Sequence, residues 1–310
     1  MKEVDGFNEE NIQYRWSRDV NPVLAVEPGE RFRLKIPDSS TKQLSPDSTR
    51  DDLMNIDEEK IDGIIGPIYV EGSEPGDTIR VNIHSIMPGK WGWTGIFSKF
   101  GILGDIFDDK ILHWRITGEH AISSDPDFLR GVDFTIKPFL GIVGTAPRFG
   151  KYHVIPPQYF GGNMDNRLIR AGSSVYLPVL TEGSLLYVSD PHALQGDGEV
   201  CGSALETSCE CEISVDVLKD LPIKTPMIES IIDEGGRVFA TTGISDNILH
   251  AAKGAVANMI DHLISRGYSQ EEAYVMCSLA GNLRISEIVD QPNYVVSFVM
   301  DSTYILRGRS

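Results

Sequence analysis

Residues 68–84, IYVEGSEPGDTIRVNIH, contain the pattern that decides the fold. Two short apolar runs, Ile68–Val70 and Thr78–His84, flank the turn Glu71–Asp77, which is rich in glycine and proline. Polar and apolar residues alternate in the second run, and this period of two is typical of a strand with one buried face. Glycine and proline favour the backbone angles of tight turns. The stretch therefore predicts two strands joined by a turn.

The same pattern recurs along most of the chain. Further strands are predicted at residues 31–36, 175–180, 184–188, 211–218, 227–232, 237–241 and 294–300. The glycine-containing turn at residues 233–236 is predicted to join two of them as a hairpin. This number of short strands indicates a mainly β protein.

One long stretch, residues 246–266, has the period of a helix. Its apolar residues recur every three or four positions, as one buried helix face requires. Ser245 or Asp246 is expected to cap its start, and Gly267 to end it. A second helix is predicted at 270–280, because a capping-box pattern precedes it. The predicted fold class is therefore mainly β with an α+β C-terminal part.

We expect a boundary near residue 150. Residues 1–150 are predicted to form a mainly β N-terminal domain, and residues 151–310 a β-rich catalytic part that contains the helical pair. Residues 86–132 show no clear periodicity and are predicted to be a long loop or lid, because loops of that length usually serve a function.

Composition limits the possible partners. The chain has 310 residues, 41% of them hydrophobic and 24% charged, and its formal net charge is −17. This negative charge argues against nucleic acid or an anionic membrane surface as a partner. The N-terminus lacks the apolar core of a signal peptide, and no stretch is long and apolar enough to cross a bilayer. We therefore expect a soluble, cytoplasmic protein with reduced cysteines.

Residues 189–206, SDPHALQGDGEVCGSALE, carry the densest set of reactive side chains: Asp190, His192, Asp197, Glu199 and Glu206. In an extended backbone, which Pro191 favours at Asp190, Asp190 and His192 point the same way and could hold one cation. The alternative is that Asp190 only orients a structural histidine. The acids would repel one another unless a cation or a shared proton offset their charge, or unless they form a solvated turn.

Three other sites are candidates, each with a simpler alternative. In the turn 161–165, Asn163 could donate hydrogen bonds to an oxyanion and Asp165 could bind a cation, or both could belong to an ordinary turn. Arg18 could contact substrate, or it could form a surface ion pair with Asp19. Cys201 could be a nucleophile, although a buried structural thiol on a strand is the alternative.

Taken together, these motifs resemble those of the acetamidase/formamidase family. The resemblance rests on WSRD (16–19) with PVL (22–24), GPIYVE (66–71) with PGD (75–77), GGNMD (161–165), DPHALQGDGE (190–199) with ALE (204–206), and NYVV (293–296). The motifs fall in order from residue 16 to residue 296 and so cover nearly the whole chain. The pattern D-x-H-x-x-Q-G-D-G-E is the most specific of them.

The resemblance implies an amidohydrolase that cleaves short linear amides, such as formamide or acetamide, to a carboxylate and ammonia. It also implies a β-sandwich or barrel-type architecture. We expect a small-molecule amide as the partner, and a homo-oligomer. Since the tract from Trp91 to Val132 follows the family pattern least clearly, the sequence leaves the preferred amide open.

Our mechanistic hypothesis uses a divalent cation, because a cation can polarise an amide and activate water. Asp190 and His192 are the expected ligands, with Asp165 and Glu206 as further candidates; Glu199, or alternatively Asp197, is the general base; Asn163 holds the oxyanion; and Gln195 and Arg18 bind substrate. Zinc suits a mixed histidine and carboxylate set, and calcium or manganese would suit one richer in oxygen. Two rival hypotheses are a non-catalytic, metal-stabilised β-sandwich that binds a small ligand and a thiol amidase that uses Cys201.

Overall fold

The computed structural model describes residues 1–232 and 235–306. Strands make up 43% of the chain and helices 15%, which confirms the predicted mainly β class. Eighteen of the described strands are linked into one hydrogen-bonded sheet, and β3 and β12 form a separate pair. Most neighbouring strands are antiparallel, as in β7 with β16 and β11 with β15.

The strands are β1 (Lys2–Asp5), β2 (Ile12–Gln13), β3 (Arg15–Trp16), β4 (Leu24–Val26), β5 (Arg31–Ile36), β6 (Ile64–Val70), β7 (Thr78–Ile96), β8 (Lys110–Thr117), β9 (His120–Ser123), β10 (Phe134–Thr135), β11 (Phe139–Thr145), β12 (Tyr152–His153), β13 (Gly161–Asn163), β14 (Ser174–Pro178), β15 (Leu186–Leu194), β16 (Leu205–Leu218), β17 (Met227–Ile231), β18 (Arg237–Ser245), β19 (Gly281–Glu287) and β20 (Tyr294–Asp301). The helices are α1 (Arg50–Met54), α2 (Ile248–Ser265), α3 (Gln270–Ala280) and α4 (Ser302–Leu306), with short 3₁₀ turns at Glu9–Asn11 and Glu58–Lys60.

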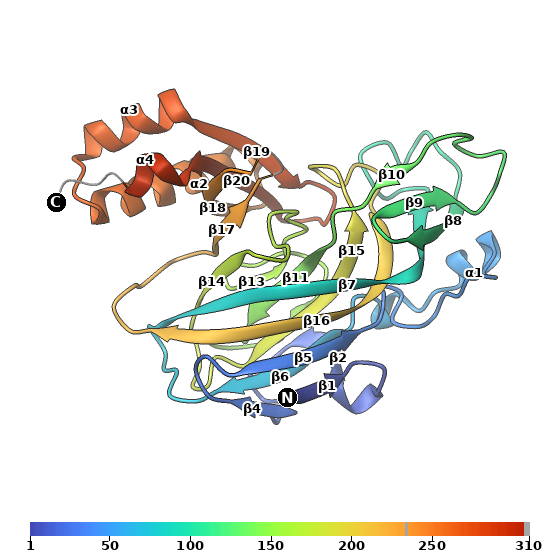
Figure 1. Cartoon of the computed structure of the whole chain (residues 1–310), viewed down its shortest axis with the longest axis horizontal. Helices are drawn as coiled ribbons and strands as arrows, with labels where there is room; N and C mark the ends of the chain where they lie inside the picture. Colours follow the sequence, from blue (N-terminus) through green and yellow to red (C-terminus); the bar gives the residue numbers. More distant parts are fainter. Residues whose placement is uncertain (233–234, 307–310) are drawn as a thin grey trace.

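The long strands β7 and β16 run antiparallel across the middle of the molecule (Figure 1). Strand β5 pairs with the other edge of β16. Its alternating sequence buries Phe32, Leu34 and Ile36 on one face and leaves its arginines and lysine on the other. These buried residues belong to the main apolar core. The alternation of polar and apolar residues that predicts β5 therefore also predicts which face of the strand is buried.

The prediction of a long loop at residues 86–132 is wrong. Strand β7 continues to Ile96, and β8 and β9 occupy residues 110–117 and 120–123. Glycines at 89, 92 and 95 interrupt the alternation that would mark a strand. Gly92 is needed because a Cβ there would lie 2.5 Å from the backbone oxygen of Glu206 on β16. Close pairing of β7 with β16 and β8 therefore forms a strand where the sequence pattern predicts none.

The sheet runs across the predicted boundary near residue 150. Strand β11, before that position, pairs with β13 and β15, which follow it. Strand β7 likewise pairs with β14 and β16. Strands from both predicted domains thus share one sheet, and this sheet positions the residues of the site.

The predicted helical pair packs against β18 and β20 at the C-terminal end of the chain. Asn247 caps α2, instead of the predicted Ser245 or Asp246, since its side chain accepts hydrogen bonds from two backbone N–H groups of the first turn. Ser269 and Glu272 form the predicted capping box of α3. Gly243 on β18 allows α2 to approach closely, because a Cβ there would lie 1.8 Å from the Ala251 oxygen.

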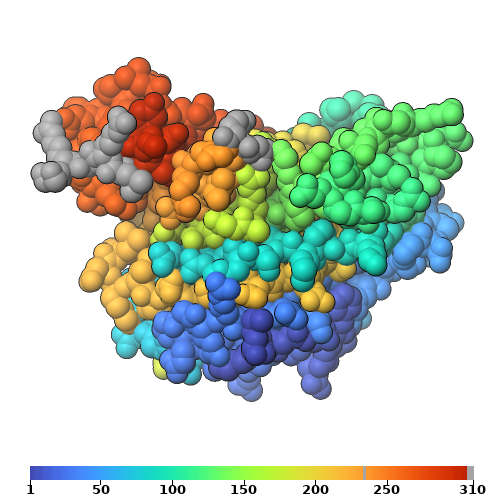
Figure 2. All heavy atoms as spheres, viewed as in Figure 1, coloured from blue at the N-terminus to red at the C-terminus, as the bar shows by residue number. Residues whose placement is uncertain are grey.

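The helical pair and the green segment that includes β8–β10 lie at opposite ends of one face of the molecule, above the N-terminal strands (Figure 2). The predicted turn at 233–236 includes residues 233 and 234, which lie outside the described residues. The strands that it would join, β17 and β18, pair antiparallel. Within the described ranges, none of the helices is both long and apolar enough to span a bilayer.

Candidate active site

A cavity of about 640 Å³ opens where several strands and loops of both halves of the chain meet. Seven ionisable side chains line one part of it, and we call this set the acidic cluster: Asp62, Asp165, Asp190, His192, Glu199, Glu206 and Asp290. All of them except Asp62 are buried. Six carboxyl groups around one imidazole are a strong concentration of negative charge for a protein interior.

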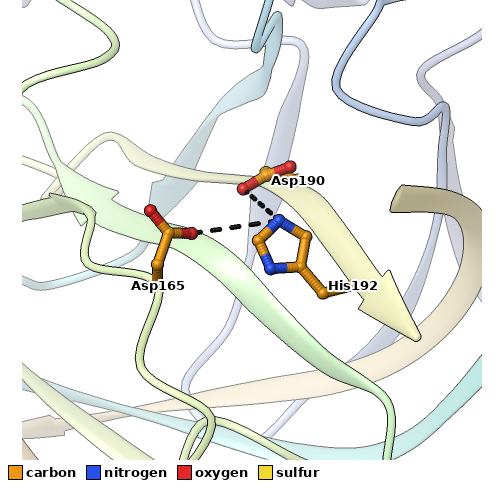
Figure 3. Close-up of side chains that lie close together, drawn as sticks. All are labelled: Asp165, Asp190 and His192. Atoms are coloured by element: carbon orange, nitrogen blue, oxygen red, sulfur yellow. Dashed lines mark ion pairs between the residues drawn. The ribbon is translucent and has the colours of Figure 1, made fainter. Parts of the chain in front are cut away.

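His192 is the centre of the acidic cluster. Its Nε2 lies 2.9 Å from Asp190 Oδ2, 3.2 Å from Glu206 Oε2 and 3.9 Å from Asp165 Oδ1. Figure 3 shows the carboxyl groups of Asp165 and Asp190 directed at this nitrogen. Burial opposes a charge on the imidazole, but the Asp190 and Glu206 carboxylates raise the pKa of His192 well above its ordinary value. The predicted ligands Asp165, Asp190 and Glu206 thus lie around the fourth predicted ligand, His192.

The backbone at the acidic cluster departs from the extended form that the sequence suggests. Asp190 has a φ of +55°, so the predicted extended conformation at Asp190 is wrong, although its side chain does converge with His192. Asp165, Glu199 and Asp62 also have positive φ, at +42°, +46° and +50°. Such angles cost roughly 1–3 kcal/mol each for residues with a Cβ and tend to gather at functional sites. Four of the six carboxyl groups are therefore aimed by strained backbone.

Gly141 on β11 makes room for two of these carboxyl groups. A Cβ at this position would lie 2.3 Å from Asp190 Oδ2 and 2.5 Å from Asp165 Oδ1. The carbonyl oxygen of Gly141 also accepts hydrogen bonds from the backbone N–H groups of Met164 and Asp165. Gly141 could not be predicted from the sequence, because a single glycine in an apolar strand carries no signal of its own.

Gln195 lies behind His192 and is buried. Its Nε2 donates to the backbone oxygen of Asp165 at 2.9 Å, so its Oε1 accepts from His192 Nδ1 at 2.7 Å. This hydrogen bond places the proton on Nδ1 and directs Nε2 at the carboxyl groups. Gln195, which the sequence predicts to bind substrate, instead has the position of a residue that orients the imidazole.

Burial makes the charged form of these acids costly. It raises the pKa of Asp165 to about 7, and the Asp190 carboxylate adds to this effect. Burial also raises the pKa of Glu199 and of Asp290 well above the ordinary range, helped by Asp165 in the first case and by Glu287 in the second. Without a compensating charge, the cluster would therefore hold protons near neutral pH.

Several buried oxygen atoms of the acidic cluster and of the neighbouring Asn163 have no hydrogen-bond partner among the described residues. They are both carboxyl oxygens of Asp165, Oδ1 of Asp190 and Oδ1 of Asn163. A buried unsatisfied polar atom costs about 1–3 kcal/mol, and more when it is charged. A cation would satisfy these atoms and offset the repulsion at the same time.

The geometry suits a cation in more than one way. Three overlapping sets place one ligand atom from each member within 4.8 Å of the others: Asp165, Asp190 and His192; His192, Glu199 and Glu206; and Asp165, Glu199 and Asp290. The hard oxygen atoms and the imidazole nitrogen are the donor types that divalent cations use in proteins. The residues present therefore fit a metal ion.

The structure adds three acids that the sequence analysis missed. Asp62 precedes β6, and Glu287 and Asp290 lie at the connection from β19 to β20. Asp290 Oδ2 accepts a hydrogen bond of 2.7 Å from Asn163 Nδ2, and Glu287 Oε1 accepts from the backbone N–H of Asp290. Glu287 is the last residue of β19, and Asp62 and Asp290 lie just before β6 and β20, where the sequence carries no motif that marks them.

Two predicted residues lie outside the acidic cluster. The Asp197 carboxylate pairs with Arg167 at 2.8 Å and with Arg284 at 2.7 Å, so it holds its loop against two other segments. Arg18 is exposed and donates to the backbone oxygen of Arg148 at 3.0 Å. Neither is among the residues that line the cavity. The predicted contact of Arg18 with substrate and the alternative role of Asp197 as base therefore do not match their positions.

Comparison with known sequences decides the family. A sequence profile of the Acetamidase/Formamidase family matches residues 3–150 and 150–304. The chain belongs to the acetamidase/formamidase family. This confirms the family and the class of enzyme, an amidohydrolase, that the motifs predict.

Individual members of the acetamidase/formamidase family match over nearly their whole length. The chain is 27% identical to a formamidase of Methylophilus methylotrophus, over 91% of this chain and 86% of the relative. It is 27% identical to an acetamidase of Mycolicibacterium smegmatis, over 84% of each. A solved structure of a predicted acetamidase/formamidase from Thermoanaerobacter tengcongensis superposes with a TM-score of 0.90 at 28% identity and covers 99% of this chain and 97% of that one. The fold of this family member is therefore that of its relatives.

Neither prediction for Cys201 matches its position in this family member. Cys201 is half-buried in a turn, so the alternative of a buried thiol on a strand is wrong, and its Sγ donates to the Ser203 oxygen at 3.2 Å. The cavity is lined by Gly202 and Ser203 but not by Cys201. The geometry thus favours the acidic cluster over the thiol as the reactive centre.

Proposed function

We propose that this chain hydrolyses the C–N bond of linear amides to a carboxylate and ammonia, with a divalent cation bound at the acidic cluster. The observation that carries the proposal is the set of buried carboxyl oxygens without hydrogen-bond partners, beside an imidazole nitrogen that Gln195 orients. The names of the relatives, formamidase and acetamidase, support the reaction.

Asp190 and His192 would hold the cation, with Asp165 and Glu206 as further ligands. Zinc suits a site in which one imidazole joins carboxylates, and calcium or manganese would suit a set that uses more of the acids. Such a cation would polarise the amide carbonyl and lower the pKa of water towards about 7. The two simpler alternatives for residues 189–206 are a structural histidine oriented by Asp190 and a solvated acidic turn. They do not account for this arrangement, because the acids are buried and gathered around one nitrogen.

Glu199 would take the proton from the attacking water and deliver it to the leaving nitrogen. Its side chain is buried and lines the cavity, and one of its carboxyl oxygens lies within 4.8 Å of ligand atoms of His192 and Glu206, close to where the cation and its water would lie. The water oxygen then becomes part of the carboxylate, and the nitrogen leaves as ammonia.

Asn163 would support the oxyanion. Its Nδ2 uses one hydrogen for Asp290, and an amide nitrogen carries two. The second hydrogen would be directed at the carbonyl oxygen as negative charge develops on it.

The first test removes the cation. We expect a chelator to abolish ammonia release from formamide and acetamide, and the addition of zinc, calcium or manganese to restore it. Metal content and ammonia are measured in the same samples. Undiminished turnover in protein shown to be free of metal would contradict the cation.

The second test replaces the base. We expect Glu199→Gln to reduce kcat by about 10²–10⁴-fold, the usual contribution of a general base, with metal content unchanged. Glu182→Gln, an exposed acid on the connection before β15, is the matched control and should retain full activity. A fully active Glu199→Gln protein would remove Glu199 from the mechanism.

A further inference from the structure

The cavity is much larger than the smallest amides. Its volume of about 640 Å³ falls in the range of pockets for drug-sized ligands, about 300–1,000 Å³. A water molecule occupies roughly 30 Å³ of liquid, so the cavity has space for roughly 20 water-sized groups, and acetamide would fill about a fifth of it. Most of the space beyond the acidic cluster is therefore left for the rest of a substrate.

Six apolar side chains line part of this remaining space. We call them the apolar wall: Leu53, Ile56, Trp93, Phe97, Phe100 and Ile155. Leu53 comes from α1 and Trp93 from β7, while the others come from connecting segments. Trp93 Nε1 donates to Asp38 at 3.0 Å, so its polar atom is satisfied and its ring contributes apolar surface. Phe97 and Phe100 pack edge to face with their centroids 6.2 Å apart.

The apolar wall is continuous with the catalytic end of the cavity. Phe100 packs against Gly202, where a Cβ would lie 2.4 Å from its ring. The backbone N–H of Ile102 also donates to the Val200 oxygen at 2.9 Å, which fixes this segment beside Glu199. A substrate whose C–N bond lies at Glu199 would thus extend its acyl group along the phenylalanine rings.

From this shape we infer that the preferred substrate is an uncharged amide with a bulky apolar acyl group, of the size of a phenylacetyl group, bound against the apolar wall. The inference rests on the proposed amide hydrolysis and names its substrate class. An acidic acyl group is disfavoured, because the carboxyl groups that line the cavity, those of the acidic cluster with Glu58 and Asp109, outnumber its one lysine, Lys99.

The substrate series on the wild-type protein tests this inference. Ammonia release gives kcat/KM for formamide, acetamide, hexanamide and phenylacetamide with the cation-loaded protein. We expect phenylacetamide to exceed acetamide by at least tenfold, because a single methylene in an apolar pocket contributes roughly 10–200-fold to discrimination. A preference for formamide or acetamide would overturn the inference and leave amide hydrolysis standing. Ammonia from none of the four amides would overturn the proposed function, and the inference with it.

A variant locates the preference in the apolar wall. We expect Phe100→Ala to lower the ratio of kcat/KM for phenylacetamide to that for acetamide by about tenfold or more. Phe149→Ala, which removes a ring that is 69% exposed and lies outside the cavity lining, should leave the ratio unchanged. If Phe100→Ala does not fold, Ile56→Trp would fill part of the same space and should lower the ratio as well. An unchanged ratio in a folded variant of either kind would overturn the inference.

Discussion

The acidic cluster and the helical layer each bury one histidine, with opposite results. His192 is 2% exposed, and the carboxylates of Asp190 and Glu206 raise the pKa of its imidazole well above the ordinary value despite its burial. His262 on α2 is 7% exposed and stacks on Phe239 with the ring centroids 4.1 Å apart. Burial, with a smaller effect of Arg266, lowers the pKa of His262 to about 4.

The difference shows that neighbours, and not burial itself, decide whether a buried histidine is a functional candidate. The ring of His262 stacks on Phe239 and remains neutral, and its Nε2 has no hydrogen-bond partner among the described residues, so the cost is that of one uncharged polar atom. His192 is surrounded by carboxyl groups that burial alone would keep protonated. Several oxygen atoms of these carboxyl groups have no hydrogen-bond partner among the described residues. A structure that were optimised only for stability would not retain such a group, so we interpret the cost as a functional requirement.

The largest expected effect is a loss of activity, and it tests the contrast between His192 and His262 directly. His192→Gln removes the only imidazole nitrogen that the described part of the acidic cluster offers a cation. We expect activity to fall by more than the roughly 10–100-fold that loss of a partner behind a metal-bound histidine costs. His262→Gln is the matched control and should leave kcat/KM unchanged. Equal losses in the two folded variants would show that both histidines act only through packing.

The second effect concerns the space beside the carboxyl groups. Gly141→Ala would push against Asp165 and Asp190, and a displacement of about 1 Å at a reacting centre can reduce the rate by about 10²-fold. Gly196→Ala is the control, because a Cβ at Gly196 meets no atom within 4 Å. Activity and metal content are measured for both. A Gly141→Ala protein with wild-type activity would show that the carboxyl groups need not lie where the structure places them.

The third effect concerns stability and acid. The pKa of His262 is lowered from 6.5 to about 4 in the folded state, so its contribution to stability is present above pH 6.5 and is lost as the pH falls towards 4. The loss amounts to roughly 3 kcal/mol, from 1.36 kcal/mol for each unit of pKa difference. Denaturant unfolding of the wild type and His262→Gln between pH 7 and 4 measures it. The difference in stability between the two proteins should shrink or reverse with acid, and a difference that is constant with pH would contradict the neutral imidazole.

The smallest effect tests the support behind His192. Gln195→Leu removes the acceptor of the Nδ1 hydrogen bond while keeping the side chain of similar size. We expect about 10–100-fold weaker metal binding, the usual cost of losing such a partner, and a parallel loss of activity at limiting metal. Excess metal should restore activity, which distinguishes this residue from one that contacts substrate. A higher KM at saturating metal would instead favour the original prediction that Gln195 binds substrate.

Local patterns predict the regular parts of the fold well. The alternation at residues 31–36 gives β5 with its observed bounds, and the capping box at Ser269 gives the start of α3. Both depend on contacts between residues that are close in sequence. The strand β7 beyond residue 86 depends instead on pairing with β16, more than a hundred residues later, and glycine hides its period. Sequence periodicity cannot reveal a strand of that kind.

The sequence predicts those residues of the site that lie close to one another along the chain. Asp190, His192, Glu199 and Glu206 lie on one strand pair and its connection, and the sequence already groups them. Asp62 and Asp290 lie in connections that are remote from residues 190–206 in the sequence, so only the folded structure shows that they line the same cavity.

Asp197 and Glu199 illustrate the same limit on a smaller scale. The two acids are separated by one glycine, and the sequence predicts Glu199 as the base with Asp197 as the alternative. Arg167 and Arg284, which engage Asp197, are remote in sequence.

The late position of Asp290 has a consequence for synthesis. Asp290 lies beside β20, and the backbone N–H of Gly198 in the Glu199 loop donates to the Ser286 oxygen of β19 at 2.9 Å. A ribosome adds residues in order at about 5–20 per second, and chains of this size fold in stages as they emerge. A nascent chain shorter than residue 290 lacks one wall of the acidic cluster, however well its earlier strands have paired. Activity that depends on the complete acidic cluster is therefore expected only after residue 290 has been made.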